Sequence, residues 1–243
     1  MNQLRPLTVC VLSDDTAPDA FLQCPRMGLA QMPKRNMELR LSFHGAIQEF
    51  HECLGTLCPD GAFSRYQKLP HNIDRFTWTG ANEQPITAWV STAKLPKDLL
   101  RRHLFHDVPL RTDYVACVAA DASLEAGWWD ALAPLLDDGA DYVGQPAWHP
   151  YSQPQMDMIQ TQPWFMGVPF DRREGRPGVS YMKPGLVVMR SEGVRQANFP
   201  DARPSGVCDS DILLGEIARQ LGWKQGVLGN GSQTQPAQNH KDG

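Results

Sequence analysis

Apolar and polar positions along the chain predict strands that alternate with helices. Residues Tyr114–Ala120 form an unbroken apolar run, which is typical of a central parallel strand buried on both faces. A similar run at Leu7–Leu12 predicts a first buried strand, and the alternation at Met37–His44 predicts a second strand. Each of the three ends in polar residues. The pattern therefore predicts a sheet that binds a ligand at the carboxyl ends of its strands, as open α/β sheets do.

Apolar side chains that recur at helical spacing predict the helices between these strands. The predicted helices are Ile47–Leu57, Lys94–His106, Leu124–Leu136 and the segment from Asp209 to Leu221, with Gly222 as a C-terminal cap. Further predicted strands are Ile73–Trp78, Trp89–Ser91, Asp141–Gly144, Gly185–Arg190 and Trp223–Leu228. The alternation predicts an α/β fold with a mostly parallel central sheet flanked by helices.

Regular patterning lapses between Gln145 and Pro184, where prolines interrupt the chain repeatedly. Aromatic side chains lie between the prolines: Trp148, His149, Tyr151, Trp164, Phe165 and Tyr181. A long irregular segment inside a compact domain is uncommon unless it forms a lid or a binding wall. We favour a binding wall whose rings stack on sugar or base faces, over the alternative that the rings only cover the sheet.

Composition narrows the class of protein. At 243 residues the chain is long enough for one large α/β domain or two small ones. Its 23 basic and 27 acidic residues give a net charge of −4, which argues against a broad electrostatic footprint for nucleic acid and leaves a local basic groove open. The N-terminus has no signal-peptide pattern and no apolar run reaches membrane-spanning length. We therefore expect a cytoplasmic protein without a transmembrane segment.

The six cysteines are scattered, and Cys10 and Cys117 lie inside apolar runs, where a thiol behaves as a small hydrophobic group. We expect them to be reduced. Residues His51, Cys53 and Cys58 suggest a zinc site, but they lack a Cys-x-x-Cys pair and a clear fourth ligand. Since Cys53 lies on an apolar helical stripe, core packing is the better interpretation.

Charged residues at strand ends and helix starts are the candidates for chemistry. Asp14 and Asp15 follow the first strand and Asp121 follows the central strand, although a solvated turn would also explain the first pair. Asp209 and Asp211 occupy a helix start, where aspartate either only caps the helix or serves as a general base. Lys94 and Arg101 belong to a basic helix that either shows its charges to water or contacts a diphosphate.

No dinucleotide fingerprint, Walker A loop or Gly-x-Ser-x-Gly elbow is present. The order of features that is present resembles the GT-A fold glycosyltransferases, particularly the family 2-like group, from about Leu7 to Leu228. The resemblance implies a Rossmann-like fold and transfer of a sugar from a nucleoside-diphosphate sugar to an acceptor hydroxyl, with inversion. It implies one domain over residues 1–228, with a nucleotide-binding half to about residue 110 and a metal- and acceptor-binding half from about residue 111. The polar composition of residues 229–243 predicts a disordered tail.

The resemblance also implies roles for particular residues. Residues Ala119–Ser123 match the Asp-x-Asp segment, so that Asp121 and Ser123 would hold Mn²⁺ or Mg²⁺ on the diphosphate. Asp211 would be the general base, with Asp209 as the second candidate. The remaining implied contacts are Asp14, Asp15 and His44 for the donor, with a UDP-sugar expected, and Trp164, Phe165 and Gly167 for the acceptor. Lys94 and Arg101 of the basic helix are further candidates for the donor.

The Asp-x-Asp segment departs from the family pattern, since Asp121 is flanked by Ala120 and Ala122. Three explanations stay open: an enzyme that offsets phosphate charge with Lys94 or Arg101, an alanine-substituted sequence, or a noncatalytic protein that binds a sugar nucleotide or a glycan. A nucleotidyltransferase is disfavoured because no glycine-rich loop follows the first strand. The acceptor also stays open among a saccharide, a lipid-linked sugar, a protein and a hydroxymethylated base in DNA.

Overall fold

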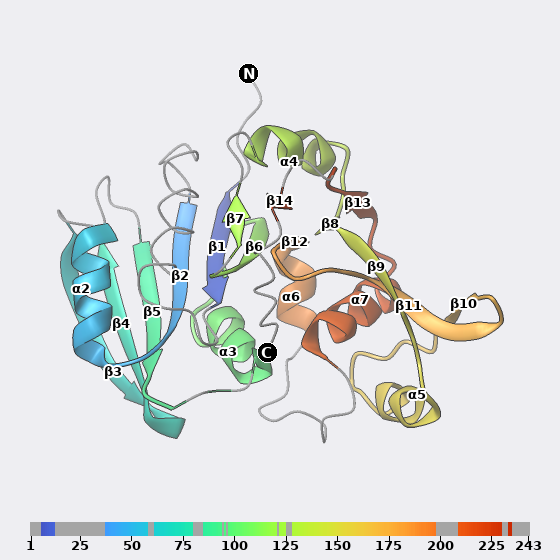
Figure 1. The fold of residues 1–243 in the computed structure, drawn as a ribbon, viewed down its shortest axis with the longest axis horizontal. Helices are drawn as coiled ribbons and strands as arrows, with labels where there is room; N and C mark the ends of the chain where they lie inside the picture. The colour runs from blue at the N-terminus through green and yellow to red at the C-terminus, as the bar shows by residue number, and fades with distance from the viewer. Residues whose placement is uncertain are drawn as a thin grey trace, which may run out of the picture.

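A nine-stranded mixed sheet runs through the molecule (Figure 1), with the strand order β13-β8-β12-β6-β1-β2-β5-β4-β3. The computed structural model describes residues 6–12, 37–57, 61–79, 85–93, 95, 97–120, 122–124, 128–197, 209–229 and 233–234. Within them no helix is long and apolar enough to cross a membrane.

The centre of the sheet is parallel, as the apolar runs predict. Its strands are β1 (Leu7–Leu12), β2 (Met37–His44), β5 (Pro85–Ser91) and β6 (Tyr114–Ala119), and β1 pairs in parallel with both β2 and β6. The flanking strands make the sheet mixed, because β4 (Ile73–Thr79) is antiparallel to β5 and β12 (Leu186–Arg190) is antiparallel to β6. The outer strands are β3 (Ala62–Leu69), followed by a 3-10 turn at Pro70–Asn72, β8 (Tyr142–Gly144) and β13 (Gln225–Val227).

Helices cover both faces of this sheet. One core contains Val9 and Val11 of β1 and is covered by α2 (Ile47–Leu57) and α4 (Trp128–Asp137). The other contains Cys10 and Leu12 and is covered by α3 (Lys97–His106), α6 (Ser191–Ala197) and α7 (Ser210–Gln220). Successive residues of β1 enter opposite cores, as the two-residue period of a strand requires.

The prediction that residues 145–184 are irregular is wrong. They contain β9 (Pro146–Pro150), α5 (Gln153–Gln160), β10 (Asp171–Arg173) and β11 (Arg176–Met182), and the strands form a sheet in the order β10-β11-β9. The prolines are compatible with these elements because Pro146 and Pro150 end an outer strand and Pro154 lies in the first turn of α5. This unit extends away from the main sheet in Figure 1.

Two further elements differ from their predictions. The helix expected from Leu124 begins at Trp128, because Ser123–Leu124 instead form β7, which pairs with β14 (Gln233–Thr234) from the predicted tail. Strand β3 was not predicted, because most of its side chains are exposed and the apolar alternation that marks a half-buried strand is missing.

The described cysteines Cys10, Cys53 and Cys117 are buried in the interior. Cys53 packs in the same core as Phe50, which agrees with its position on an apolar stripe. Within the described residues, no group of three or more His, Cys, Asp or Glu side chains is placed to hold a metal ion.

Candidate functional site

The carboxyl ends of the parallel strands meet at one edge of the sheet. There the Ala120 amide donates to the Leu12 carbonyl at 2.9 Å, and the Ala119 amide donates to the Gly185 carbonyl at 2.9 Å. Strands β1 and β6 therefore end side by side, each two residues before a predicted acidic position, Asp14 after β1 and Asp121 after β6. Those positions, Asp14, Asp15 and Asp121, lie outside the described residues, as does Lys94.

His44 lies at the same edge, as the last residue of β2. It is half-buried and pairs across the sheet with Ser91, the last residue of β5. Ser123 comes four residues after the end of β6 in the sequence and begins β7. The structure thus gathers the ends of four neighbouring parallel strands where the sequence predicts a nucleotide site.

The start of α7 presents its two aspartates differently. Asp209 is the N-cap, is exposed, and accepts a hydrogen bond on Oδ1 from the Asp211 amide at 3.1 Å. Asp211 is only 3% exposed, and its Oδ1 accepts a hydrogen bond from Nη2 of Arg101. One carboxylate therefore faces solvent and the other forms a buried ion pair.

Arg101 lies in a different setting from the one expected of a diphosphate ligand. It is 3% exposed in α3, and its Nη1 donates to the Ser210 hydroxyl while Nη2 contacts Asp211. A phosphate would have to displace a carboxylate to reach this guanidinium. The sequence could not distinguish this partner from a phosphate, because both match the planar fork of arginine.

The charges of Arg101 and Asp211 act on buried side chains of β6 and β8. Burial raises the pKa of Cys117 to about 12, and the charge of Arg101 lowers it while that of Asp211 raises it. Burial likewise raises the pKa of Tyr142, where the same two charges act in the same opposite senses. Cys117 lies two residues before the end of β6 and shares a core with Ile212 and Leu213, so the first turns of α7 pack under the carboxyl half of the central strand.

Tyr181 joins this site from β11. Burial raises the pKa of its hydroxyl, and the carboxylates of Asp211 and then Asp209 raise it further. Close packing brings it there, because a Cβ added at Gly215 of α7 would lie 2.6 Å from the Tyr181 Cβ. The sequence indicated an aromatic wall but did not pair Tyr181 with the aspartates. Gly215, inside an otherwise regular helix, was the available signal of a close approach.

The predicted acceptor residues lie at the opposite end of α7. The amides of Met166 and Val168 donate to Oε1 of Gln220 at 3.0 and 3.1 Å, with Gly167 between them at φ +78°. Gln220 is the last residue of an 11-residue helix, so it lies about 16 Å along the axis from the helix start. The structure therefore does not bring this loop next to Asp209.

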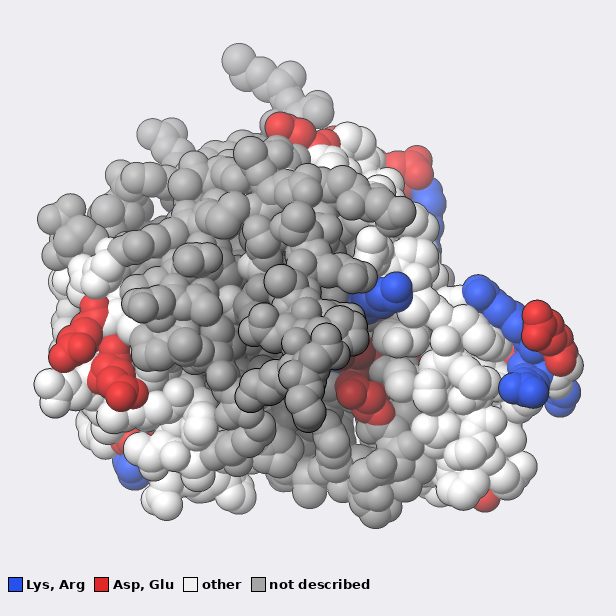
Figure 2. Space-filling view, in the orientation of Figure 1, with Lys and Arg blue, Asp and Glu red and all other residues white. Residues whose placement is uncertain are grey.

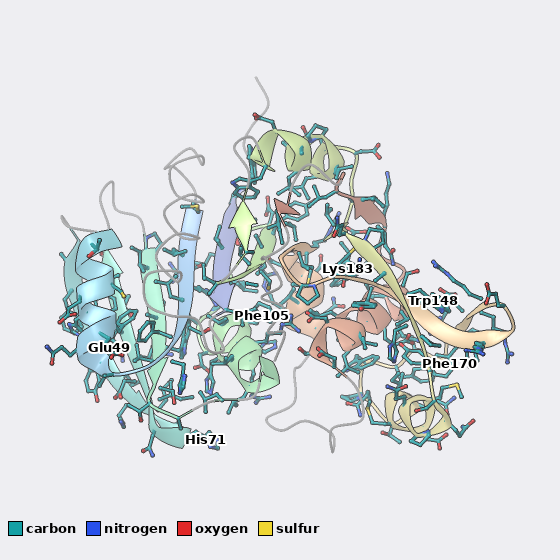
Figure 3. All side chains as sticks on the ribbon, in the orientation of Figure 1. Glu49, His71, Phe105, Trp148, Phe170 and Lys183 are labelled. Atoms are coloured by element: carbon teal, nitrogen blue, oxygen red, sulfur yellow. The ribbon has the colours of Figure 1, made fainter. Side chains whose placement is uncertain are left out.

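Trp164 and Phe165 from the same loop contribute to the interior. Trp164 is 8% exposed, and the Phe165 ring centroid lies 6.3 Å from that of Phe170. In Figure 3, Phe170 and Trp148 are labelled beside α5 and β11, whereas Lys183 is labelled near the centre of the molecule, where β11 returns to the main sheet. Lys183 is exposed and lies two residues before Gly185, so it is a basic side chain near the site that the sequence did not single out.

A pocket of about 210 Å³ lies elsewhere, at the amino end of β6. Its walls include Asp113, Arg190, Glu192 and Arg195, and Arg190 already pairs with Asp141 at 2.5 Å. Charges of both signs also alternate at the tip of the β10–β11 hairpin, at the right of Figure 2, where Arg172, Arg173 and Glu174 are exposed. Neither surface has the single sign of charge that would favour a polyanion.

Comparisons with known proteins agree with this geometry at the level of the fold. No protein-family model matches the sequence, and a search of curated proteins finds no relative by sequence. Among solved structures, a mannosyltransferase from Pyrobaculum calidifontis in complex with GDP-Man and Mn²⁺ is similar, with a TM-score of 0.60 and 11% identity over 99% of this chain. Residues 1–349 of S. aureus TarS are also similar, with a TM-score of 0.50 and 8% identity over 93% of this chain.

The chain spans 59% of the mannosyltransferase chain and 58% of the TarS chain. At such low identities the likeness concerns the backbone and not the side chains of a site. It nevertheless covers nearly the whole sequence, including the central sheet and α7. The chain therefore shares its α/β fold with these two proteins.

Proposed function

We propose that this protein transfers a sugar from a nucleoside-diphosphate sugar to an acceptor hydroxyl. The observation that carries the proposal is the edge of the sheet at which β1 and β6 end side by side, with Leu12 and Cys117 packed in the same core as the first turns of α7. Open α/β sheets bind nucleotides at such an edge. The fold shared with a mannosyltransferase that binds GDP-Man supports the same reading.

Asp209 is the better candidate for the general base. A base must reach the proton of the attacking hydroxyl, and Asp209 is exposed at the helix start, whereas Asp211 is buried against Arg101. As the acceptor oxygen bonds to the anomeric carbon, its proton passes to Asp209 and the bond from that carbon to the diphosphate oxygen breaks. The electron pair of that bond leaves with the nucleoside diphosphate, and the anomeric centre inverts.

The donor would lie along the carboxyl edge, with Asp14, Asp15 and His44 near the nucleoside and Asp121 near the diphosphate. A divalent cation, if held by Asp121 and Ser123, would also be bound by phosphate oxygens and water, and would offset the charge of the leaving group. Lys183 could contribute a further positive charge. The nucleotide is a uridine or a guanosine diphosphate in this proposal, with the sequence resemblance favouring the first and the mannosyltransferase complex the second.

A protein that binds a sugar nucleotide or a glycan without turnover is the second candidate. The observation that favours it is the replacement of carboxylates around Asp121 by Ala120 and Ala122. Ala120 is 2% exposed and packs in the core with Val118, so this position is shaped for an apolar side chain.

Release of nucleoside diphosphate from a panel of UDP- and GDP-sugars, with Mn²⁺ and with Mg²⁺, separates the two candidates. An enzyme releases diphosphate from at least one donor, and Asp209→Asn lowers that rate at least about 100-fold without weakening donor binding. The matched control is Asp157→Asn, which changes an exposed carboxylate on α5 and leaves the rate unchanged. Binding without release by the unmodified protein would support the noncatalytic candidate, and equal release by Asp209→Asn would exclude Asp209 as the base.

A further inference from the structure

Arg101 connects two parts of the chain that are far apart in sequence. From α3 it donates one hydrogen bond to the Ser210 hydroxyl and one to the Asp211 carboxylate, across 109 and 110 positions of the chain. All three residues are buried, with exposures of 3% or less. Because a guanidinium is planar and its donors have fixed directions, two contacts on adjacent residues restrict both the position and the rotation of a helix start.

Asp209 is the exposed residue next to Ser210 and Asp211. Its Oδ1 accepts from the Asp211 amide at 3.1 Å and lies 3.5 Å from the Ser210 hydroxyl. The same hydroxyl that accepts from Arg101 therefore touches the exposed carboxylate. Any movement of Ser210 and Asp211 relative to α3 would carry Asp209 with it.

We propose that Arg101 and Asp211 form a positioning pair, which fixes the start of α7 so that Asp209 faces the acceptor and which leaves Asp211 out of proton transfer. The catalytic part of this inference rests on the proposed transferase function, whereas the mechanical part does not. The pair joins α3, which precedes the central strand, to the helix that carries the base.

The charges around Asp209 give this pair a specific signature. The charged or titratable groups facing the helix start are Arg101 from α3, Asp211 from α7 and Tyr181 from β11. Arg101→Met leaves a second negative charge near the base, whereas Asp211→Asn leaves a positive one. The acidic limb of the pH–rate profile consequently moves to higher pH in the first variant and to lower pH in the second.

Four variants test the proposal: Arg101→Met, Asp211→Asn, Arg101→Lys and the double variant Arg101→Met/Asp211→Leu. Each is measured by melting temperature, by amide hydrogen exchange at residues 209–213, and by kcat and donor KM. The single variants Arg101→Met and Asp211→Asn are expected to melt at lower temperature, since each leaves one buried charge without its partner. The double variant removes both charges and recovers the melting temperature.

The positioning role is tested by amide exchange and kcat, which the double variant is not expected to recover. Its amides at the start of α7 should exchange at least about 10-fold faster than in the unmodified protein, relative to amides of β1. Its kcat should fall about 100-fold at an unchanged donor KM, as expected when a reacting group is displaced by about 1 Å. Arg101→Lys keeps the charge without the fork and should have an intermediate kcat. The control Arg65→Met removes an exposed guanidinium from β3 and should leave all three readouts unchanged.

A double variant that recovers melting temperature, local exchange and kcat together would overturn the proposal, because the pair would then stabilise the fold without positioning the base. The proposal would also be contradicted if the acidic limb of the pH–rate profile did not shift in opposite directions in Arg101→Met and Asp211→Asn. If no donor is turned over by the unmodified protein, the transferase function fails. Local exchange would still decide whether Arg101 holds the start of α7.

Discussion

At the residue scale, Asp107 shows how one carboxylate joins a helix end to the sheet. Its Oδ2 accepts from Nε1 of Trp89 at 2.8 Å and lies 2.7 Å from Nδ1 of His103. Burial acts to raise the pKa of Asp107, but hydrogen bonds from His103 and Trp89 and the charge of Arg75 outweigh it, so the pKa is lowered. The ionised form is therefore the one that stabilises the fold.

Stability should depend on pH through this carboxylate. A group whose pKa is lowered on folding contributes fully above its unfolded value, near pH 4, and loses that contribution as the pH falls through its folded value. Asp107→Asn should therefore reduce the free energy of unfolding by about 1–3 kcal/mol at pH 7 and flatten its decline below about pH 4. Denaturant unfolding between about pH 3 and pH 7 measures both effects. An unchanged decline in the variant would show that other carboxylates govern acid unfolding.

At the scale of elements, the C-terminal end of α7 holds the loop from Trp164 to Phe170. Besides accepting from two loop amides, Gln220 donates to the Val168 carbonyl at 3.0 Å and to Glu216 at 2.8 Å. Arg219 donates to the carbonyls of Val168 and Pro169 and lies over the Phe170 ring at 5.6 Å. One helix therefore carries the candidate base at its start and fixes an aromatic loop at its end.

Removing the Gln220 amide should release this loop. Gln220→Ala deletes hydrogen bonds to three backbone groups and is expected to cost about 1–3 kcal/mol, with faster amide exchange confined to residues 164–170. The matched control is Gln48→Ala, on an exposed face of α2. Slow exchange retained in the loop of the Gln220 variant would mean that ring packing alone fixes it.

Most strands of the main sheet could be predicted from the sequence, because buried strands leave apolar runs or a two-residue alternation of apolar side chains. The bounds of β1 and β2 agree with their apolar patterns, and α2 agrees with its stripe. Strand β3 and the β9–β11 unit were missed for a different reason. Strand β3 pairs with its neighbour β4 but exposes most of its side chains, so it lacks an apolar alternation. Strand β9 pairs with the more distant β11, which packs on α7 through a glycine, and this leaves little periodic signal in the chain.

The candidate site was predicted in part. The sequence correctly places His44 at a strand end and Asp209 at a helix start, because both follow from local pattern. It could not indicate that Asp211 is buried or that Arg101 is its partner, since the two lie 110 positions apart. Long-range ion pairs depend on how helices dock, which a periodic pattern does not specify.

At the scale of the whole molecule, the proposed cleft depends on whether the segment around Asp121 can hold a cation. The two flanking alanines differ in burial, since Ala120 is 2% exposed whereas Ala122 is only partly buried. Ala122→Asp should therefore strengthen Mn²⁺-dependent donor binding, because a second carboxylate adds a hard oxygen ligand. Ala120→Asp should instead lower the melting temperature, because it buries a charge in the core. Calorimetry with and without Mn²⁺ measures the first effect, and an unchanged metal dependence in Ala122→Asp would place the cation elsewhere.

The proposed transferase function requires that a sugar nucleotide binds at the carboxyl edge of the sheet. Calorimetric titration of the unmodified protein with GDP-mannose and with UDP-glucose, in the presence of Mn²⁺, tests this requirement most directly. A transferase is expected to bind at least one of these two donors saturably, with one site per chain. Absence of binding to either donor, by protein that melts cooperatively in the same buffer, would contradict the proposed function.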